Sequence, residues 1–308
     1  VQIEPQFGFS YTAVRDIARA AHAAGFTRLW VSDHLLLHKD AVAVDCLEAW
    51  TLLAALARDT EGIRIGPMVS AQSYRNPALL AKMAAGVDQM SGGRLDFGVG
   101  AGWKELEYRQ YGYDFPEPGV RVTQLVETLE ICTRLWRDER ATYRGKHYHV
   151  EGAVAAPKPL QHPLPIWIGG TKPRVMRVAA KYAQWFNMSN PSTSVDERVA
   201  QLRADLAAAC AAVGRDPATL RTSLFVSVYV GATRRELDAL VDELAAKAGT
   251  TREGWLAARP GAFMGTADEL GERFRALAAA GIDHANLLFP YGHELDGVKA
   301  LAEVARDR

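Results

Sequence analysis

Strand-length apolar runs alternate with amphipathic helical patterns along the whole chain, and this alternation limits the fold more than any other feature of the sequence. Runs such as TRLWVS (27–32), RLDFGVG (94–100) and PIWIGG (165–170) are each followed by a helical pattern. Parallel strands need a crossover of this kind, so the order predicts a parallel sheet covered by helices. Eight units can be counted, which favours a closed (β/α)8 TIM barrel over the alternative, an open doubly wound sheet.

The boundaries of the units follow from apolar periodicity and from local stop and start signals. Strands are expected at residues 1–4, 27–32, 63–70, 94–100, 165–170, 184–189, 220–230 and 284–290. Helices are expected at residues 11–24, 47–59, 77–91, 122–137, 173–182, 195–213, from 234, at 251–259, at 267–280 and from about 295. Gly25 is a helix stop, and Asn76 is an N-cap followed by proline at the first helical position.

Residues 142–165 interrupt the alternation. TYRGKHYHVEG is typical of a hairpin, and APKPLQHPLP is an extended proline-rich run. Because the alternation resumes at once, we interpret 142–165 as an insertion between units four and five. Residues 1–308 are then one domain, since a barrel of this type needs roughly 250 residues.

Composition narrows the partners and the compartment. Lys plus Arg and Asp plus Glu both total 36, so charge gives no support for a nucleic-acid or membrane-surface partner. Three widely spaced cysteines without a CxxC pair indicate neither a disulfide framework nor a thiolate metal site, and a cytoplasmic location is expected. No apolar run approaches the ~20 residues of a membrane span. The chain opens at Val1 in strand-like sequence without a signal peptide, so a few initial residues are expected to be missing.

In such barrels the active site lies at the carboxyl ends of the strands. Asp33 and His34 follow the second strand, where histidine can move a proton and the carboxylate can hold a polar edge of a cofactor. A capped loop with His34 bonded to backbone explains the pair equally well. Glu4, at the end of the first strand, is the second candidate for proton transfer, since partial burial can raise a carboxyl pKa. His147 and His149 alternate on the hairpin, but no third ligand is nearby, so we predict no metal site.

The turn Gly169-Gly170-Thr171-Lys172 lies between the fifth strand and its helix. Bare glycine backbone, free N–H groups at a helix start and a lysine favour a phosphate, although a tight turn without a ligand has the same sequence. Gly98 to Gly102 lacks GxGxxG spacing, so a Rossmann fingerprint is rejected. These glycines leave room for a flat ligand instead. GxSxG and P-loop patterns are absent, so hydrolase interpretations have no support.

Three stretches carry a family resemblance: GFTRLWVSDHLL (25–36), SYRNPALLAKMAAGVDQMSGGRLDFGVGAGWKELEY (73–108) and PKPLQHPLPIWIGG (157–170). They resemble the luciferase-like monooxygenase superfamily. Within it they are most similar to actinobacterial-type oxidoreductases that depend on coenzyme F420, the 8-hydroxy-5-deazaflavin. The resemblance covers about the first two thirds of the chain and implies hydride transfer at the deazaflavin ring with a small-molecule substrate. An FMN-dependent monooxygenase and a non-catalytic flavin-binding protein are the alternatives.

The resemblance also implies roles for individual residues. Asp33 and His34 match residues beside the reactive ring, and His34 matches the group that assists proton movement. A bulge behind the ring, which often carries a non-proline cis peptide, is matched by Met68, Val69 and Ser70. The wall after the fourth strand is matched by Gly102 and Trp103, and the turn at the phosphate tail is matched by Gly169 and Gly170.

Two departures from the sugar-phosphate dehydrogenases of this branch bear on the substrate. Trp103 replaces an acidic catalytic residue, and Ser189-Asn190-Pro191 lacks the lysine used for substrate phosphate. An apolar or aromatic-faced substrate is therefore expected in place of glucose 6-phosphate. Alanine-rich outer helices at 47–59 and 77–91 favour a homodimer, the commonest soluble assembly.

Overall fold

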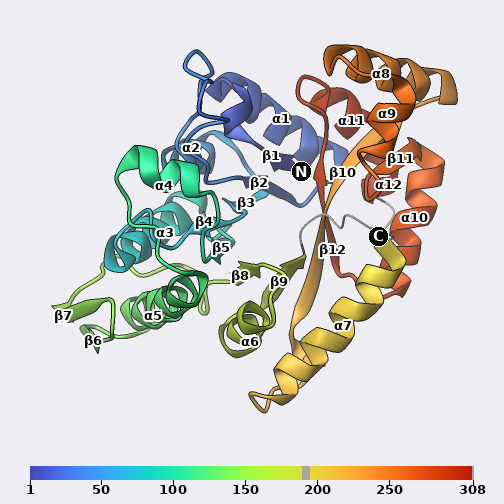
Figure 1. Ribbon diagram of the computed structural model, residues 1–308. Coiled ribbons are helices and arrows are strands. Elements are labelled where there is room, and N and C mark those ends of the chain that lie inside the picture. The colour runs from blue at the N-terminus through green and yellow to red at the C-terminus, as the bar shows by residue number, and fades with distance from the viewer. Residues whose placement is uncertain (189–194, 307–308) are drawn as a thin grey trace.

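The protein is built around a ring of parallel strands, in a computed structural model that describes residues 1–188 and 195–306. Figure 1 shows the strands with helices packed around them. Within those residues the ring is formed by β1 (Gln2–Ile3), β2 (Arg28–Val31), β3 (Arg64–Pro67) with its continuation β4 (Ser70–Ala71), β5 (Phe97–Gly100), β8 (Ile166–Gly169), β9 (Trp185–Met188), β10 (Arg221–Gly231) and β12 (His284–Leu288). A parallel bridge between Ile65 and Leu95 joins β3 to the chain entering β5 and closes the ring. The predicted (β/α)8 barrel is confirmed.

Helices surround the ring and follow the strands in the predicted order. They are η1 (Pro5–Phe7), α1 (Tyr11–Ala24), α2 (Ala49–Asp59), α3 (Pro77–Ser91), α4 (Glu105–Tyr111), α5 (Pro118–Arg137), α6 (Pro173–Tyr182), α7 (Val195–Ala211), η2 (Pro217–Thr219), α8 (Arg234–Lys247), α9 (Arg252–Ala257), α10 (Ala267–Ala279), α11 (Glu294–Ala300) and α12 (Ala302–Arg306). Gly25 ends α1 with φ 99°, and the side chain of Asn76 accepts a hydrogen bond from Ala78 N at the start of α3. Both end signals are confirmed. Among the described helices, none is long and apolar enough to cross a lipid bilayer.

The interruption after the fourth unit is an antiparallel hairpin, which Figure 1 shows protruding at the lower left. It consists of β6 (Ala141–Arg144) and β7 (His149–Ala153), and the ring resumes at β8. The interpretation of this segment as an insertion is confirmed. His149 is exposed and His147 is half-buried on this hairpin.

Several elements differ from expectation. The predicted strand 63–70 divides into β3 and β4 at a cis peptide between Met68 and Val69, which confirms the cis bond implied by the resemblance. The helix expected at 122–137 begins four residues earlier, at Pro118. A further strand, β11 (Phe263–Thr266), lies between the helices predicted at 251–259 and 267–280, where no element was expected, and pairs with the last four residues of β10, which extend beyond the ring.

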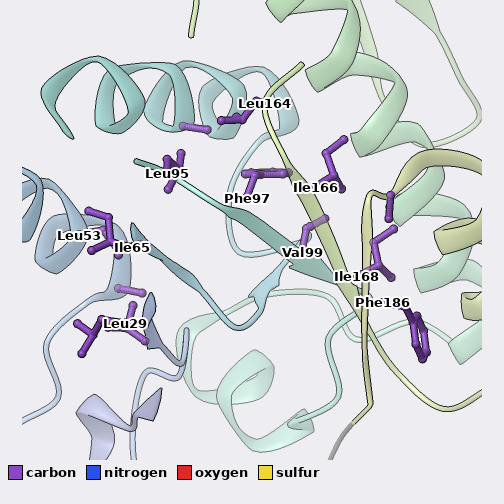
Figure 2. Packing of buried hydrophobic residues seen from close by; sticks show 14 of the residues in the cluster. Leu29, Leu53, Ile65, Leu95, Phe97, Val99, Leu164, Ile166, Ile168 and Phe186 are labelled. Atoms are coloured by element: carbon purple, nitrogen blue, oxygen red, sulfur yellow. The ribbon is translucent and has the colours of Figure 1, made fainter. Parts of the chain in front are cut away.

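The main core lies between the outer face of the ring and the helices. Figure 2 shows Leu29, Ile65, Phe97, Ile166 and Phe186, from consecutive strands of the ring, pointing toward the helical layer. All five are at most 4% exposed. Alternate residues of the same strands point inward, because successive side chains of a strand lie on opposite faces.

Inside the ring, the amino-terminal end is filled by aromatic and charged side chains. Trp167 and Trp185 are stacked with ring centroids 4.2 Å apart, and Trp30 meets Trp167 edge-on at 4.6 Å. Arg28 lies 5.2 Å from the Trp167 ring centroid and donates to the buried Asp96 at 2.9 Å. A Cβ on Gly66 would lie 2.8 Å from Trp30 Cζ3 and 2.2 Å from a backbone oxygen, so only glycine fits there. This packing leaves the opposite, carboxyl end of the barrel for a site.

Candidate active site

Asp33 follows β2 at the carboxyl end of the ring, and its carboxylate is buried against an arginine. Arg75 donates to both oxygens of Asp33, at 2.6 and 2.9 Å, and also pairs with Glu48 at the start of α2. The Asp33 side chain is 0% exposed. A direct contact between Asp33 and a cofactor stays a prediction. In the structure, the Asp33 carboxylate joins the β2–α2 loop to the loop before α3.

His34 stands beside Asp33 and is bonded through one ring nitrogen. Nδ1 lies 2.9 Å from Oε2 and 3.2 Å from Oε1 of Glu107, while the side chain is 19% exposed. Within the described residues, Nε2 of His34 has no hydrogen-bond partner. The predicted alternative, a ring bonded to backbone, is not what the structure shows. The ring has a carboxylate on one side and a free nitrogen on the other.

Glu107 is a completely buried residue on α4 whose carboxylate accepts several hydrogen bonds. Besides His34, it accepts hydrogen bonds from the backbone N–H groups of Leu35 and Leu36 at 2.8 and 3.3 Å and from the hydroxyl of Tyr74 at 2.7 Å. Lys104 Nζ lies 3.2 Å from Oε1. Burial alone would raise the pKa of Glu107, but the hydrogen bond and charge of His34 and the bonds from Tyr74 and Leu35 outweigh it. The pKa of Glu107 falls from 4.5 to about 2.

This lowered pKa gives a pH dependence of stability. Because the folded state holds the ionised form of Glu107 more tightly than the unfolded state does, its contribution is complete above about pH 4.5 and is lost as pH falls toward about 2. We expect Glu107→Gln to reduce the free energy of unfolding by about 1–3 kcal/mol at neutral pH. Urea denaturation of both proteins should show that difference shrinking between about pH 4.5 and about pH 2. A difference that stays constant down to the acid limit would contradict this account.

Glu4 also lies at this end, half-buried after β1. Its oxygens accept amide hydrogen bonds from Gln2, at 2.8 Å, and from Gln6. Gln6 in turn accepts from Ser32 at 2.7 Å, and Gln2 accepts from Asn286 at 2.9 Å. Glu4 therefore belongs to a polar network inside the barrel, and its role as a second proton-transfer group stays a prediction.

The bulge at Met68, Val69 and Ser70 forms a ledge at the carboxyl end of the ring. A Cβ on Gly100 would come within 2.7 Å of a Val69 methyl group, so the valine packs directly over that glycine. Met68 and Val69 are half-buried, whereas Ser70 is fully buried and accepts a hydrogen bond from the indole of Trp50 at 2.8 Å. Ser70 thus supports the ledge from behind.

Gly102 and Trp103 follow β5 and lie beside His34. Gly102 has φ 79°, and a Cβ there would meet the Tyr108 hydroxyl at 1.8 Å. Trp103 is 72% exposed and meets the His34 ring edge-on with centroids 5.6 Å apart. The wall predicted after the fourth strand therefore presents an exposed indole next to the imidazole.

The turn from Gly169 to Lys172 lies between β8 and α6, as predicted. Gly170 has φ 152°, and Lys172 is the exposed N-cap residue of α6, with Pro173 at the first helical position. No side chain of the described residues caps this helix end. A helix start of this kind beside a lysine can attract an anion. Thr171 is half-buried in the same turn, and phosphate binding there stays a prediction. Ser189, Asn190 and Pro191, the loop without a lysine, lie outside the described residues.

Two central residues were not singled out in the sequence, Glu107 and Arg75. Each pairs with the Asp33-His34 segment across a long separation, 73 residues for Glu107 and 42 for Arg75. Both stand within the stretch 73–108 that carries the family resemblance. The resemblance over that stretch was the sequence signal that could have identified these two residues.

The barrel defines a (β/α)8 protein, and the histidine–carboxylate pair and the glycine-lined ledge lie at the carboxyl ends of its strands, where active sites of this fold are built. The sequence model of the luciferase-like monooxygenase family matches residues 2–284. The chain belongs to this family.

Curated relatives match part of the chain in sequence. A glucose-6-phosphate dehydrogenase of Microbacterium testaceum, described as F420-dependent, is 33% identical over 181 residues, which is 58% of this chain and 52% of that protein. An F420-dependent hydroxymycolic acid dehydrogenase of Mycobacterium tuberculosis is 30% identical over 215 residues, 68% of this chain and 58% of that protein. The chain thus spans about half the length of the curated relatives it matches.

The fold is shared over the full length with solved structures. An F420-dependent secondary alcohol dehydrogenase in complex with an F420-acetone adduct aligns with a TM-score of 0.82 and 20% identity. The alignment covers 100% of this chain and 98% of that one. At this identity the likeness concerns the fold.

Proposed function

We propose that the protein is an oxidoreductase that transfers a hydride between the deazaflavin coenzyme F420 and a small organic substrate. The observation that carries the proposal is His34, whose Nδ1 is bonded to Glu107 and whose Nε2 has no partner among the described residues. It stands at the end of the barrel where chemistry occurs in this fold. The F420-dependent relatives support the choice of cofactor.

The residues present fit such a cofactor. The Val69 ledge over Gly100 offers an apolar surface for a flat ring, and a side chain on Gly100 would displace it. The uncapped start of α6 with Lys172 suits a phosphate on the tail. When bound, the deazaflavin supplies a two-electron carrier that accepts or donates hydride at a ring carbon.

His34 moves the accompanying proton. When a substrate C–H bond gives up its hydride, the proton of the adjoining hydroxyl or amine must leave, and a neutral imidazole nitrogen can accept it. The substrate then becomes a carbonyl or an imine, and the reverse reaction returns the proton from His34. Trp103 borders the same space, with its ring edge-on to that of His34.

The charges around His34 favour an uncharged substrate with an apolar face. Two cations that contact neighbouring groups are occupied: Lys104 donates to the carbonyl groups of Leu36 and Leu37, and Arg75 binds Asp33. The exposed indole of Trp103 offers apolar contact instead. Activity on glucose 6-phosphate, the substrate named for a relative, is therefore not proposed.

The test is a binding comparison of purified protein with coenzyme F420, FMN and FAD by absorbance and fluorescence titration. The proposal expects F420 to bind at least tenfold more tightly than either flavin. Preference for FMN would favour the oxygen-dependent monooxygenase. Tight F420 binding without hydride exchange over a broad panel of alcohols, ketones and imines would favour a carrier protein.

Lys172 should contribute measurably to cofactor binding. We expect Lys172→Ala to weaken F420 affinity by roughly 1–3 kcal/mol, because one charged hydrogen bond to phosphate is lost. Titration of both proteins measures the change. Lys146→Ala, at an exposed lysine in the hairpin turn, is the matched control and should leave affinity unaltered. Equal affinities for all three proteins would remove Lys172 from the site.

We also propose a homodimer in a reducing, cytoplasmic setting. Leu79 and Met90 expose 54% and 38% of their surfaces on the outer helix α3, and such exposed apolar side chains could pack against a second copy. Cys46, Cys132 and Cys210 are unpaired, as expected where thiols stay reduced. Light scattering at micromolar concentration tests the assembly, and a particle of 33.7 kDa would contradict it.

A further inference from the structure

We propose that Glu107 is a positioning residue that fixes the neutral His34 ring as its Nδ1–H tautomer, which leaves the Nε2 lone pair as the proton acceptor. The activity part of this inference rests on the proposed function. The tautomer part rests on the hydrogen bonds alone, and it can be measured without cofactor or substrate.

The surroundings of the Glu107 carboxylate leave one arrangement of protons. Its Oε1 accepts the backbone N–H groups of Leu35 and Leu36 and lies 3.2 Å from Lys104 Nζ. Its Oε2 accepts the hydroxyl of Tyr74 at 2.7 Å and lies 2.9 Å from Nδ1 of His34. An ionised carboxylate only accepts hydrogen bonds, so Nδ1 must carry the hydrogen in this pair. A neutral imidazole protonated at Nδ1 has its lone pair on Nε2.

Burial makes this preference strong. Glu107 is 0% exposed, so its carboxylate is shielded from bulk solvent, and an unpaired charge there would be costly. The same carboxylate also holds the backbone of Leu35 and Leu36, the two residues after His34. One buried group therefore sets both the tautomer of the ring and the position of the chain segment that carries it.

Glu107→Gln tests the tautomer, because it exchanges one acceptor for a donor at nearly constant shape. Two backbone N–H groups and Lys104 require an acceptor at the position of Oε1, so the amide NH₂ must occupy the position of Oε2. Tyr74 can adapt, since a hydroxyl can donate or accept. Nδ1 of His34 then faces a donor and must accept, which moves the ring hydrogen to Nε2.

The measurement is ¹⁵N NMR of the ring nitrogens in histidine-labelled protein, at a pH where the imidazole is neutral. His34→Ala identifies the His34 signals by their loss. The wild-type protein should show a protonated Nδ1 and a bare Nε2, and Glu107→Gln should show the reverse. Glu105→Gln is the control, an exposed neighbour on α4 paired with Arg109, and it should match the wild type.

A wild-type ring protonated at Nε2, or an unchanged tautomer in Glu107→Gln, would overturn the proposal. The wild-type measurement decides even if the variant is too unstable to study.

The activity arm asks whether Glu107 acts through His34. Glu107→Gln should lower the single-turnover rate by at least about tenfold. The loss should not exceed the 10²–10⁴-fold loss expected when the acid–base group itself is removed. In a His34→Ala background the same change should have little further effect, because the ring that it positions is gone. An equal loss in both backgrounds would overturn the positioning role. If His34→Ala keeps full rate while the tautomers are as expected, the proposed acid–base function fails and the structural assignment stands.

Discussion

Replacement of His34 by alanine is expected to lower the rate of hydride transfer by about 10²–10⁴-fold while cofactor affinity stays nearly intact. The reason is geometric: the Nε2 atom has no partner within the described residues and the ring stands beside exposed Trp103, whereas Val69 and Lys172, proposed to hold the cofactor ring and phosphate tail, follow other strands. The rate is measured in single turnover by the change in deazaflavin absorbance, with a substrate identified from the panel of alcohols, ketones and imines.

A matched control lies four residues further along the same loop. His38 is exposed, and among the described contacts its side chain accepts a hydrogen bond only from the backbone N–H of Asp40, so His38→Ala should keep the full rate. A full rate in His34→Ala would shift the proton to Glu4 or to water. A His34→Ala protein that cannot bind cofactor would make His34 a binding residue.

The second large effect concerns stability at the opposite end of the barrel. Asp96 is 1% exposed and accepts hydrogen bonds from Arg28 at 2.9 Å and from Arg64 at 2.7 and 2.9 Å. Burial lowers the pKa of Arg28, which shows how far this guanidinium is removed from water. Asp96→Asn leaves two adjacent cations without their anion. Since removing one partner of a buried ion pair is strongly destabilising, we expect a loss of about 3–5 kcal/mol in the free energy of unfolding.

Urea denaturation monitored by circular dichroism measures this loss. Asp16→Asn is the control, because Asp16 is 49% exposed and pairs with Arg15 at the surface, where such pairs contribute about 0–1 kcal/mol. A loss below about 1 kcal/mol for Asp96→Asn would mean that aromatic packing alone maintains the amino-terminal end of the barrel.

The fold could be predicted because its signals are local. Gly25 and Asn76 mark helix ends by their own backbone conformation and side chain, and the apolar runs are long enough to identify each strand. The strand β11 was missed because its four residues pair with an extension of β10 that is visible only in three dimensions. The short helix α4 was missed for a different reason: GWKELEYRQYGY is rich in charge and shows little of the apolar periodicity that identifies a helix.

The site could be predicted in position but only partly in its contacts. Asp33, His34, the cis peptide after Met68 and the turn at Gly169 lie where the strand ends and the resemblance placed them. Their partners could not be read from sequence, because an ion pair such as His34 with Glu107 joins residues 73 positions apart. No local pattern encodes which acidic residue of α4 turns inward.

Trp103 gives the molecule an optical reporter of its own. The chain has seven tryptophans, all within the described residues, and the other six are at most 8% exposed. Iodide or acrylamide in the solvent should therefore quench emission from Trp103 selectively, and that emission should lie at longer wavelength than the emission of the six buried indoles. Any molecule that settles against His34 would shield the same indole. Occupancy of the site can thus be followed by loss of quenching, before any turnover is detected and without an added label.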